Sequence, residues 1–361
     1  MAKKQFILAI SPHNLYTKIS VLNKKGMEVV SSKVQCYNPS VKMYSQRDFR
    51  VGDIIDELRR FGITLGELIC TVGTGGILRP MPGGTYFITP KLLEDIRIAY
   101  GGGHITNLGA LIAFEIAKKA NIKAYMVDSM SVDEMPEEAR ITGLPYIKRT
   151  AISYALDMKY IGTMVAEKIC KNINDSSFIV CQMNEEVSTI ALKNGKIVDA
   201  VNFYDEGVFS IKSCGDIPPL KLASKALEYK GDYKSFCNEM YNQSGLLQLM
   251  EFSTVERLKE VIMNDIVIEE YRDVMEAFSY GVAKDIGTMA SALSFKVDRI
   301  ILTGDLCASH FIMDNIARRV SFISPVEVIQ GNYEIEAMFN GVKRVLDNIE
   351  QPKIYENEVD I

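Results

Sequence analysis

Apolar and polar positions alternate in blocks along the chain, and one order of blocks occurs twice. An apolar run over 6–10 is followed by a polar turn and by two alternating segments over 17–22 and 27–30. This order predicts a strand followed by a β-hairpin. The same order returns at 178–198, where Asn194-Gly195 is a typical hairpin dipeptide. Two copies about half a chain apart indicate a duplicated domain.

Between and after these copies, short apolar runs alternate with segments whose apolar residues recur every three or four positions. The second pattern is typical of amphipathic helices. It predicts helices over 51–61, 90–100, 107–120, 151–171, 220–228, 233–241, 255–263, 269–294, 310–320 and 333–348. The short runs predict further strands at 68–72, 124–127, 299–302 and 326–329. Strands and helices mixed in two repeated halves predict an α/β fold with a central cleft.

The expected domain organisation follows from this repeat. We expect an N-terminal α/β domain over 1–150, completed by a final helix over 331–348, and a C-terminal α/β domain over 151–330. A chain of 361 residues is long enough for two domains with full cores. Residues 349–361 are mostly polar, and we expect a frayed tail there.

Composition narrows the class of protein without identifying it. The chain is 47% hydrophobic and 24% charged, which is typical of a globular protein. Its net charge of -5 argues against nucleic-acid binding, which needs a basic surface. No apolar stretch predicts a membrane span, and no cleavage-site pattern follows the first apolar run, so we expect a cytoplasmic protein. Seven scattered cysteines and only three histidines make a zinc site improbable and suit reduced thiols.

A glycine-rich loop follows the predicted strand at 68–72. Gly73, Gly75 and Gly76 come directly after the strand, and a second corner contains Gly83 and Gly84. Glycines in such a place let the backbone approach a ligand closely. A plain tight turn has the same composition, so the loop by itself leaves both interpretations open.

The chain resembles butyrate kinase, of the acetate kinase family and of the superfamily that contains sugar kinases, Hsp70 and actin. The resemblance is nearly full length, and its best segments are residues 73–86, 104–110, 132–134, 139–145, 302–304 and 320–325. It implies a duplicated, actin-like and ribonuclease H-like fold, which agrees with the repeated hairpin. It also implies phosphoryl transfer between ATP and a short-chain fatty acid, with Mg²⁺ and ATP as cofactors and a homodimer as the assembly.

The resemblance also implies roles for individual residues. The matching positions are Asp128 and Lys18 for catalysis; Thr17, Gly73, Gly75, Gly76 and Gly304 for nucleotide or phosphate binding; His104, Gly83 and Gly84 on the substrate side; and Glu336 for the metal. For the two carboxylates, a helix cap or an ordinary surface position is an equal alternative. The histidine opens a predicted helix, where capping or packing explains it as well.

Arginines of the family pattern are missing at two positions. Gly73-Thr-Gly-Gly76 stands where the family has Gly-Arg-Gly-Gly, and Ser213 stands at another arginine position. Loss of an arginine that neutralises the transferring phosphoryl group lowers the rate by on the order of a thousandfold. Candidate substitutes for the missing charge are Lys18, Arg79 and Lys212.

Both phosphate turns of the family pattern are altered as well. The first, residues 11–18, has lost most of its small hydroxyl residues. In the second, Asn184, Glu185 and Glu186 replace three glycines, and two carboxylates repel a polyphosphate unless a metal bridges them. On the side expected to bind adenosine, Asp305 takes the place of a glycine.

Three functional hypotheses follow. The favoured one is a weak or inactive homologue that binds a partner through its second half. The alternative is an active acyl kinase, with butyrate or another short-chain carboxylate as substrate, that uses the substitute cations. A different phosphotransferase on the same fold, such as a sugar kinase, is the third, and the butyrate-kinase-like loop over 73–86 counts against it.

Overall fold

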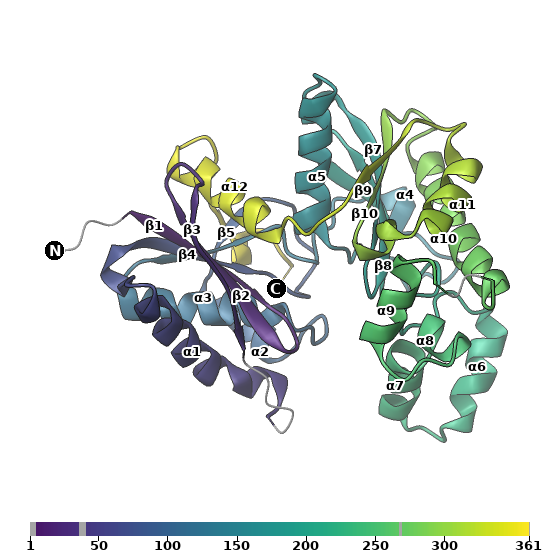
Figure 1. Cartoon of the computed structure of the whole chain (residues 1–361), viewed down its shortest axis with the longest axis horizontal. Coiled ribbons are helices and arrows are strands. Elements are labelled where there is room, and N and C mark those ends of the chain that lie inside the picture. The colour runs from purple at the N-terminus through teal and green to yellow at the C-terminus, as the bar shows by residue number, and fades with distance from the viewer. Residues whose placement is uncertain (1–4, 36–40, 267–268, 361) are drawn as a thin grey trace. The chain divides into compact units, whose positions relative to one another are not determined.

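The computed structural model describes residues 5–35, 41–266 and 269–360, which form two compact units. Unit 1 comprises Met1–Asp133, Ala155–Asp157 and Tyr333–Ile361, and unit 2 comprises Glu134–Tyr154 and Met158–Asn332. Each unit contains one β-sheet with helices against it (Figure 1). The predicted α/β class with two duplicated halves is confirmed.

Unit 1 is built on a seven-stranded sheet in the order β12-β5-β6-β4-β1-β2-β3. β1, β2 and β3 form an antiparallel meander, and β4 and β6 continue the sheet in parallel from β1. The strands are β1 (Phe6–Pro12), β2 (Tyr16–Asn23), β3 (Glu28–Gln35), β4 (Leu68–Thr74), β5 (Thr85–Phe87), β6 (Lys123–Val127) and β12 (Lys353–Ile354).

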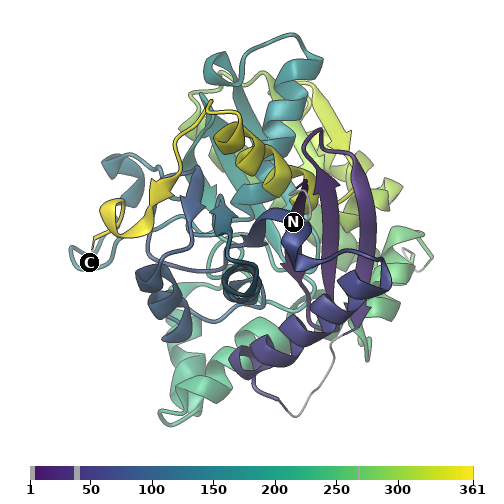
Figure 2. The ribbon, with the colours of Figure 1, turned by 90° about the vertical axis from the view of Figure 1, so that its left-hand side faces the viewer.

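Helices cover both faces of this sheet. α3 packs against β4, β6 and β1, with α1 beside it against β3, whereas α12 crosses the other face over β1, β4 and β6 (Figure 2). The helices of unit 1 are α1 (Arg47–Arg60), α2 (Pro90–Arg97), α3 (Asn107–Ala120) and α12 (Glu334–Leu346), with short 3-10 helices η1 (Met43–Gln46), η2 (Leu65–Glu67) and η5 (Tyr355–Asn357). The inner faces of α1 and α3 supply much of the apolar core.

The C-terminal segment belongs to the core of unit 1, so the expectation of a frayed tail over 349–361 is wrong. β12 pairs in parallel with β5, and Tyr355 is fully buried. The Tyr355 hydroxyl donates to Asp95 Oδ2 at 3.0 Å and accepts the Arg79 N–H at 3.2 Å. One buried aromatic residue and its hydrogen bonds hold a segment whose polar composition predicted fraying.

Unit 2 repeats the arrangement of unit 1 in a five-stranded sheet of order β11-β10-β7-β8-β9. β7, β8 and β9 form the antiparallel meander, and β10 and β11 extend it in parallel, as β4 and β6 do in unit 1. The strands are β7 (Ser177–Met183), β8 (Val187–Lys193), β9 (Lys196–Val201), β10 (Arg299–Thr303) and β11 (Val326–Ile329). The predicted duplication of strand and hairpin is confirmed.

The helices of unit 2 include one long core helix, α10 (Arg272–Ala292), which packs on β7, β8 and β9. Gly162 of α5 (Ala155–Lys168) allows close packing against Leu192 and Phe178 of the sheet, where a Cβ would collide with Leu192. The others are α4 (Glu137–Arg140), α5 (Ala155–Lys168), η3 (Ile173–Asp175), α6 (Pro219–Glu228), α7 (Tyr233–Asn242), α8 (Gly245–Leu249), α9 (Val255–Met263), η4 (Asp305–Ala308) and α11 (His310–Val320). No helix in the described part of the chain is long and apolar enough to cross a bilayer.

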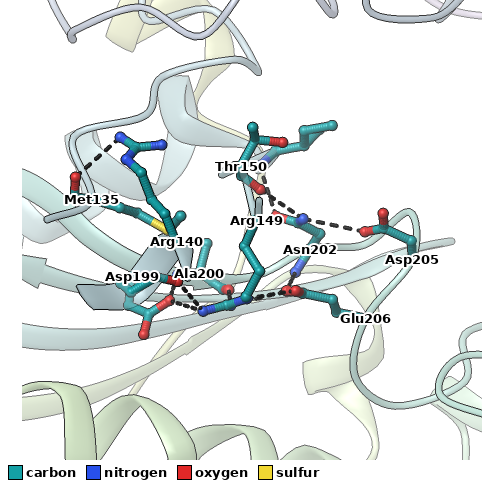
Figure 3. Close-up of polar contacts among 11 residues, drawn as sticks. Met135, Arg140, Arg149, Thr150, Asp199, Ala200, Asn202, Asp205 and Glu206 are labelled. Atoms are coloured by element: carbon teal, nitrogen blue, oxygen red, sulfur yellow. Dashed lines mark hydrogen bonds and ion pairs between the residues drawn. The ribbon is translucent and has the colours of Figure 1, made fainter. Parts of the chain in front are cut away.

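One arginine attaches the segment that precedes α5 to the edge strand β9 (Figure 3). Arg149 Nε and Nη2 donate to the two carboxylate oxygens of Glu206 at 2.7 and 3.1 Å, and Nη1 donates to Asp199 Oδ1 at 3.1 Å. The guanidinium also donates to the backbone oxygens of Ala139 (2.9 Å) and Ala200 (2.6 Å). The bond to the Ala200 oxygen occupies one backbone acceptor of β9 that an exposed sheet edge would otherwise offer to another chain.

Two predicted helices end earlier than their apolar periodicity suggests. α2 ends at Arg97 and α5 ends at Lys168. Shortly after each end, a residue lies in the left-handed region, namely Ala99 with φ 51° and Cys170 with φ 57°. A left-handed residue after the last turn is a common way to end a helix, but without a glycine the sequence does not mark it.

Candidate functional site

A buried arginine holds the polar turn between β1 and β2 in unit 1. Arg50 of α1 donates from Nη1 to the backbone oxygens of His13 and Tyr16, at 3.0 and 3.2 Å, and to Thr17 Oγ1 at 2.9 Å. Its Nη2 donates to the backbone oxygen of Asn14 at 3.3 Å. A buried guanidinium has to satisfy its N–H groups within the protein, and here the turn supplies most of the acceptors. The hydroxyl of Thr17, a predicted phosphate ligand, is therefore engaged with Arg50.

The sequence analysis missed Arg50, although α1 contains a signal for it. The helix buries Val51, Ile54 and Leu58, and Arg50 is fully buried beside them. A charged residue next to an apolar stripe in an amphipathic helix indicates a buried cation that needs several acceptors.

The first turn of α12 meets the same β1–β2 turn. The Ser11 hydroxyl donates to Glu334 Oε2, and His13 Nε2 lies 3.4 Å from Ser11 Oγ and 3.9 Å from the Glu334 carboxylate. Burial lowers the pKa of His13 below its ordinary value, although the Glu334 carboxylate opposes that shift. Glu336, the residue expected to hold a metal, is exposed on the same helix. The structure thus places Glu334, not Glu336, beside this turn.

Gly73, near the end of β4, and Gly75 and Gly76, which follow the strand, have a packing role in unit 1. A Cβ at Gly73 would collide with the backbone of Gly109 in α3, and a Cβ at Gly75 would collide with Met126. At Gly76 the colliding group would be the Asn107 side chain. All three glycines are buried. They are therefore explained by the close approach of this loop to α3 and β6, whether or not the loop also approaches a ligand.

Side chains of unit 1 bind the backbone of the same loop. Asn107 Oδ1 accepts the Ile77 N–H at 3.0 Å, and Asn107 Nδ2 donates to the Ile77 oxygen at 3.2 Å. Ser129 Oγ donates to the Gly76 oxygen at 2.8 Å, and Ser131 Oγ accepts the Leu78 N–H at 2.8 Å. The loop is held in one conformation by hydrogen bonds inside the unit.

The structure brings the predicted catalytic Asp128 next to the predicted substrate-side Gly84. Asp128 Oδ1 accepts the Gly84 N–H at 2.8 Å, and the Asp128 N–H donates to the Gly84 oxygen at 3.1 Å. Gly84 has φ +136°, a conformation that favours glycine, and Gly83 precedes it in the same corner. The carboxylate therefore fixes the backbone of this corner.

His104 lies just before α3, as predicted. Its Nδ1 is 2.7 Å from Thr106 Oγ1 and accepts the Thr106 N–H at 3.3 Å. Thr74, which the resemblance aligns with an arginine, donates from its hydroxyl to the Thr106 oxygen at 3.1 Å. The Thr74 hydroxyl is thereby part of the link between the glycine loop and α3.

Of the cations considered as substitutes in unit 1, Arg79 is already paired. Its Nε donates to Asp95 Oδ2 at 2.6 Å, and its guanidinium lies 3.8 Å from the centre of the Tyr100 ring. Its Nη1 donates to the Asp360 backbone oxygen at 2.7 Å. Lys18, half-buried on β2, has no ion pair within the described ranges.

In unit 2, the β7–β8 turn over 184–186 corresponds to the β1–β2 turn of unit 1. Asn184 Oδ1 accepts the Asp305 N–H at 2.9 Å, and the Asn184 N–H donates to the Glu186 oxygen at 3.0 Å. Gly304, a predicted nucleotide ligand, packs so closely on this turn that a Cβ would collide with the Met183 oxygen. Gly304 is therefore in contact with the altered turn and belongs to a different unit from the other predicted ligands.

Both carboxylates of this turn have partners within unit 2. Glu185 forms an ion pair with Lys212 at 2.9 Å, and its backbone oxygen accepts the Ile211 N–H at 3.1 Å. Glu186 accepts a hydrogen bond from the Tyr154 hydroxyl. Burial raises the pKa of Glu186 to about 7, partly offset by the charge of Lys212. We refer to residues 184–186 with these partners as the turn seal.

The residues of the turn seal do not fit nucleotide phosphates. Carboxyl groups stand at two of its three positions, and the N–H of Asn184 is used inside the turn. The Asp305 carboxylate, paired with Lys259, adds another negative charge next to Gly304. Across the ranges described, no group of three or more His, Cys, Asp or Glu residues is arranged to hold a metal ion that would bridge these charges to phosphate.

The two matched sheets, each a meander extended in parallel, define an actin-like fold of two α/β domains. A sequence model of the acetokinase family matches residues 86–326, more than half of the chain. The chain therefore belongs to the acetokinase family. The reaction of that family is phosphoryl transfer between ATP and a short-chain carboxylate.

Solved structures agree on the fold. Acetate kinase from Porphyromonas gingivalis is 16% identical and superposes with a TM-score of 0.76, with 95% of this chain and 99% of that chain covered. A propionate kinase from Francisella tularensis is 16% identical (TM-score 0.73; 93% and 98% covered). Acetate kinase from Entamoeba histolytica is 15% identical (TM-score 0.74; 93% and 98% covered). At these identities the likeness establishes the architecture, and the chemistry has to be argued from the residues.

Proposed function

We propose that this chain is a weak or catalytically inactive member of the acetokinase family, derived from a kinase of short-chain fatty acids such as butyrate. The turn seal is the observation that carries the proposal. In unit 2 the side chains of residues 184–186 bind Asp305, Lys212 and Tyr154 of the same unit. A turn that has to receive a polyphosphate needs free backbone N–H groups and no nearby carboxylates.

The supply of positive charge supports the same proposal. Thr74 and Ser213 stand at the two arginine positions, and neither side chain carries charge. Of the three candidate substitutes, Arg79 is bonded to Asp95 and Lys212 is paired with Glu185. Phosphoryl transfer to a carboxylate brings like charges together, so the rate depends on unpaired cations near the phosphoryl group.

Lys18 is the observation that favours the alternative, an active acyl kinase with a substitute cation. It lies on β2 beside Thr17, and it has no ion pair among the residues with described positions. The homodimer, the cytoplasmic location, the use of Mg²⁺ and ATP, and the carboxylate preference stay predictions under both hypotheses.

The test is formation of acyl phosphate from MgATP and butyrate, acetate or propionate, trapped with hydroxylamine. We expect turnover at least about a thousandfold below the one per second or more that is ordinary for enzymes. Turnover near one per second would contradict the proposal. The Lys18→Ala variant is the matched control for that outcome. If the variant loses the turnover, the activity depends on Lys18 and does not come from a contaminating kinase.

A further inference from the structure

A buried carboxyl group of α10 meets the segment that follows β9 in unit 2. Asp285 is 9% exposed, and its Oδ2 accepts the Val208 N–H at 3.1 Å. Gly207 has φ +77°, and a Cβ on it would lie 2.8 Å from the same carboxylate oxygen. One turn earlier on α10, a Cβ on Gly281 would collide with the Val208 side chain. The segment therefore packs directly on one face of α10, at positions four residues apart.

The same segment covers the turn seal. We call residues 205–216 the acidic loop, because three of its members are carboxylic acids, namely Asp205, Glu206 and Asp216. The Ile211 N–H of the loop donates to the Glu185 oxygen at 3.1 Å, and Lys212 pairs with the Glu185 carboxylate at 2.9 Å. The acidic loop thus contacts α10 at one point and the turn seal at another, so opening of the loop uncovers residues of the turn.

The surroundings of Asp285 disfavour its ionised form. Burial raises the pKa of Asp285 to about 7, against the opposing effect of the Val208 N–H. Asp216 and Glu206 act on the carboxyl group from the acidic loop and raise its pKa further, whereas Lys284 of α10 opposes them. An ionised Asp285 would therefore be a buried carboxylate with two negative charges close by.

Other elements packed on α10 bring no compensating cation to this carboxyl group. Burial raises the pKa of the Cys181 thiol of β7 to about 12, so the thiol stays neutral beside Asp285. The charged Asp199 of β9 is bound by Arg149, which also binds Glu206 (Figure 3). The side chains that β8 and α11 add to this core are uncharged and include Val187, Ala191, Ile312 and Ile316.

We propose that the acidic loop stays closed on α10 only while Asp285 carries a proton, so that this contact is a pH-dependent latch over the turn seal. The inference concerns regulation of the turn seal and rests on the proposed function for what the open loop uncovers. Neither Asp285 nor Asp216 has an ion pair among the residues whose positions are described. Loss of the proton therefore leaves two carboxylates close together with no cation paired to either.

Hydration decides the direction of the latch. One N–H, from Val208, does not replace the water shell of a carboxylate, and water reaches Asp285 only when the acidic loop moves away from α10. The closed loop retains a proton that the open loop releases, so the population of the open form rises with pH. This dependence is confined to the range between the ordinary pKa of an aspartate and the raised pKa in the closed form.

Hydrogen exchange of the acidic loop, followed by mass spectrometry on the full chain without nucleotide, tests the latch. The exchange rate of the wild type is divided by that of Asp285→Asn at the same pH, which removes the intrinsic pH dependence of exchange. With the pKa of Asp285 near 7 in the closed form and ordinary in the open form, we expect this ratio to rise about tenfold between pH 6 and 8. Strand β10 should keep its protection in both proteins, because the opening is local.

Two further variants make the test specific. Asp273→Asn, at an exposed carboxylate in the first turn of α10, is the matched control and should exchange like the wild type at each pH. Asp216→Asn removes one of the charges that raise the pKa of Asp285, so the exchange of its acidic loop, corrected for intrinsic rates, should respond at a lower pH than in the wild type. This variant tests the latch even if Asp285→Asn does not fold, which circular dichroism checks.

Three outcomes would overturn the latch. The first is a ratio of wild type to Asp285→Asn that is the same at pH 6 and 8. The second is a rise of equal size in β10, which would mean global unfolding. The third is a response in Asp216→Asn at the same pH as in the wild type. Because no nucleotide is present, the result does not depend on whether the turn seal has replaced nucleotide binding, which MgATP titration tests separately.

Discussion

The β1–β2 turn of unit 1 and the β7–β8 turn of unit 2 occupy equivalent places in two copies of one sheet, yet they are held in opposite ways. In unit 1 a cation from a helix, Arg50, binds the backbone oxygens of the turn. In unit 2 the turn supplies its own anions, Glu185 and Glu186, and the surrounding segments provide Lys212 and Tyr154. Duplication therefore preserved the strands and left the chemistry of the two turns to diverge.

This difference separates two requirements that glycine-rich and hydroxyl-rich turns usually satisfy together. A turn has to satisfy its own backbone, and a ligand-binding turn also has to keep N–H groups available. Arg50 satisfies carbonyl groups and leaves Lys18 without an ion pair in the described chain. The turn seal satisfies unit 2 internally and so removes groups that a phosphate would need.

The largest effect is expected from Arg50→Ala. It removes the Arg50 donors from the backbone oxygens of His13 and Asn14 and from the Thr17 hydroxyl, whereas the Tyr16 oxygen keeps the His13 N–H. A buried polar group that loses its partner costs about 1–3 kcal/mol. We expect the free energy of unfolding to fall by about 3 kcal/mol or more, measured by urea denaturation. Arg59→Ala is the control, because Arg59 is exposed and forms an ion pair with Asp56 on the same helix. A fall no larger than in this control would show that Arg50 does not support the turn.

Arg149→Ala tests in the same way whether this arginine attaches the segment before α5 to strand β9 in unit 2. The arginine is partly exposed and makes five hydrogen bonds, two of them to Glu206. We expect a loss of about 2 kcal/mol, because charged hydrogen bonds contribute about 1.5–3 kcal/mol but solvent screens this site. Arg257→Ala, which removes an exposed pair with Glu260, should change stability by less than about 0.5 kcal/mol. Equal losses in the two variants would contradict the anchoring role.

Glu186→Gln tests the turn seal through pH. The pKa of Glu186 is raised from 4.5 to about 7 in the folded protein, so folding retains a proton that the unfolded chain releases. Its contribution to stability is full below about pH 4.5 and is lost as pH rises through about 7. The variant should be more stable than the wild type at pH 8, by about 1–2 kcal/mol, and should lose part of the decline between pH 5 and 8. The rest of the decline in stability comes from Asp285, because burial raises the pKa of this carboxyl to about 7 as well.

Thermal denaturation across this pH range gives the measurement. Glu138→Gln, at an exposed carboxylate of unit 2, is the matched control and should leave the pH profile unchanged. A Glu186→Gln profile that coincides with the wild type would mean that burial does not raise the pKa of Glu186 in the folded protein.

The smallest effect is expected from Lys212→Met. This lysine pairs with Glu185 at a half-exposed position, and such pairs contribute about 0–1 kcal/mol. Stability should fall by no more than about 1 kcal/mol, and the pKa of Glu186 should rise further because the opposing charge is gone. Titration of Glu186 by NMR in the two proteins checks this. An unchanged pKa of Glu186 would show that Lys212 interacts with Glu185 alone and not with Glu186.

The fold could be predicted from the sequence because it depends on periodicity. The repeated hairpin and α3 over Asn107–Ala120 follow directly from apolar spacing. The packing of residues 350–360 could not be predicted in this way. Tyr355 is one buried aromatic residue in a polar segment, and its partners, Asp95 and Arg79, are distant in sequence. Spacing within a segment says nothing about such a contact.

The candidate site was less predictable for the same reason. Glycine at 73, 75 and 76 suggested a ligand, but the Cβ positions collide with protein groups that lie more than 30 residues further along the chain. Glu334 and Glu336 are alike in sequence, and only the direction of the first turn of α12 places Glu334 beside Ser11. The partner of Glu186, Tyr154, comes from another segment and had no motif to indicate it.

The central claim is that the turn seal has replaced nucleotide binding in unit 2. Calorimetric titration of the full chain with MgATP tests it most directly, with Asn184→Gly/Glu185→Gly/Glu186→Gly as the companion variant. We expect no binding heat for the wild-type chain at millimolar MgATP. We expect the glycine variant to be folded but less stable, and any binding heat that it gives would be nucleotide binding recovered by removal of the turn seal. A wild-type Kd in the micromolar range would contradict the claim, whatever the affinity of the glycine variant.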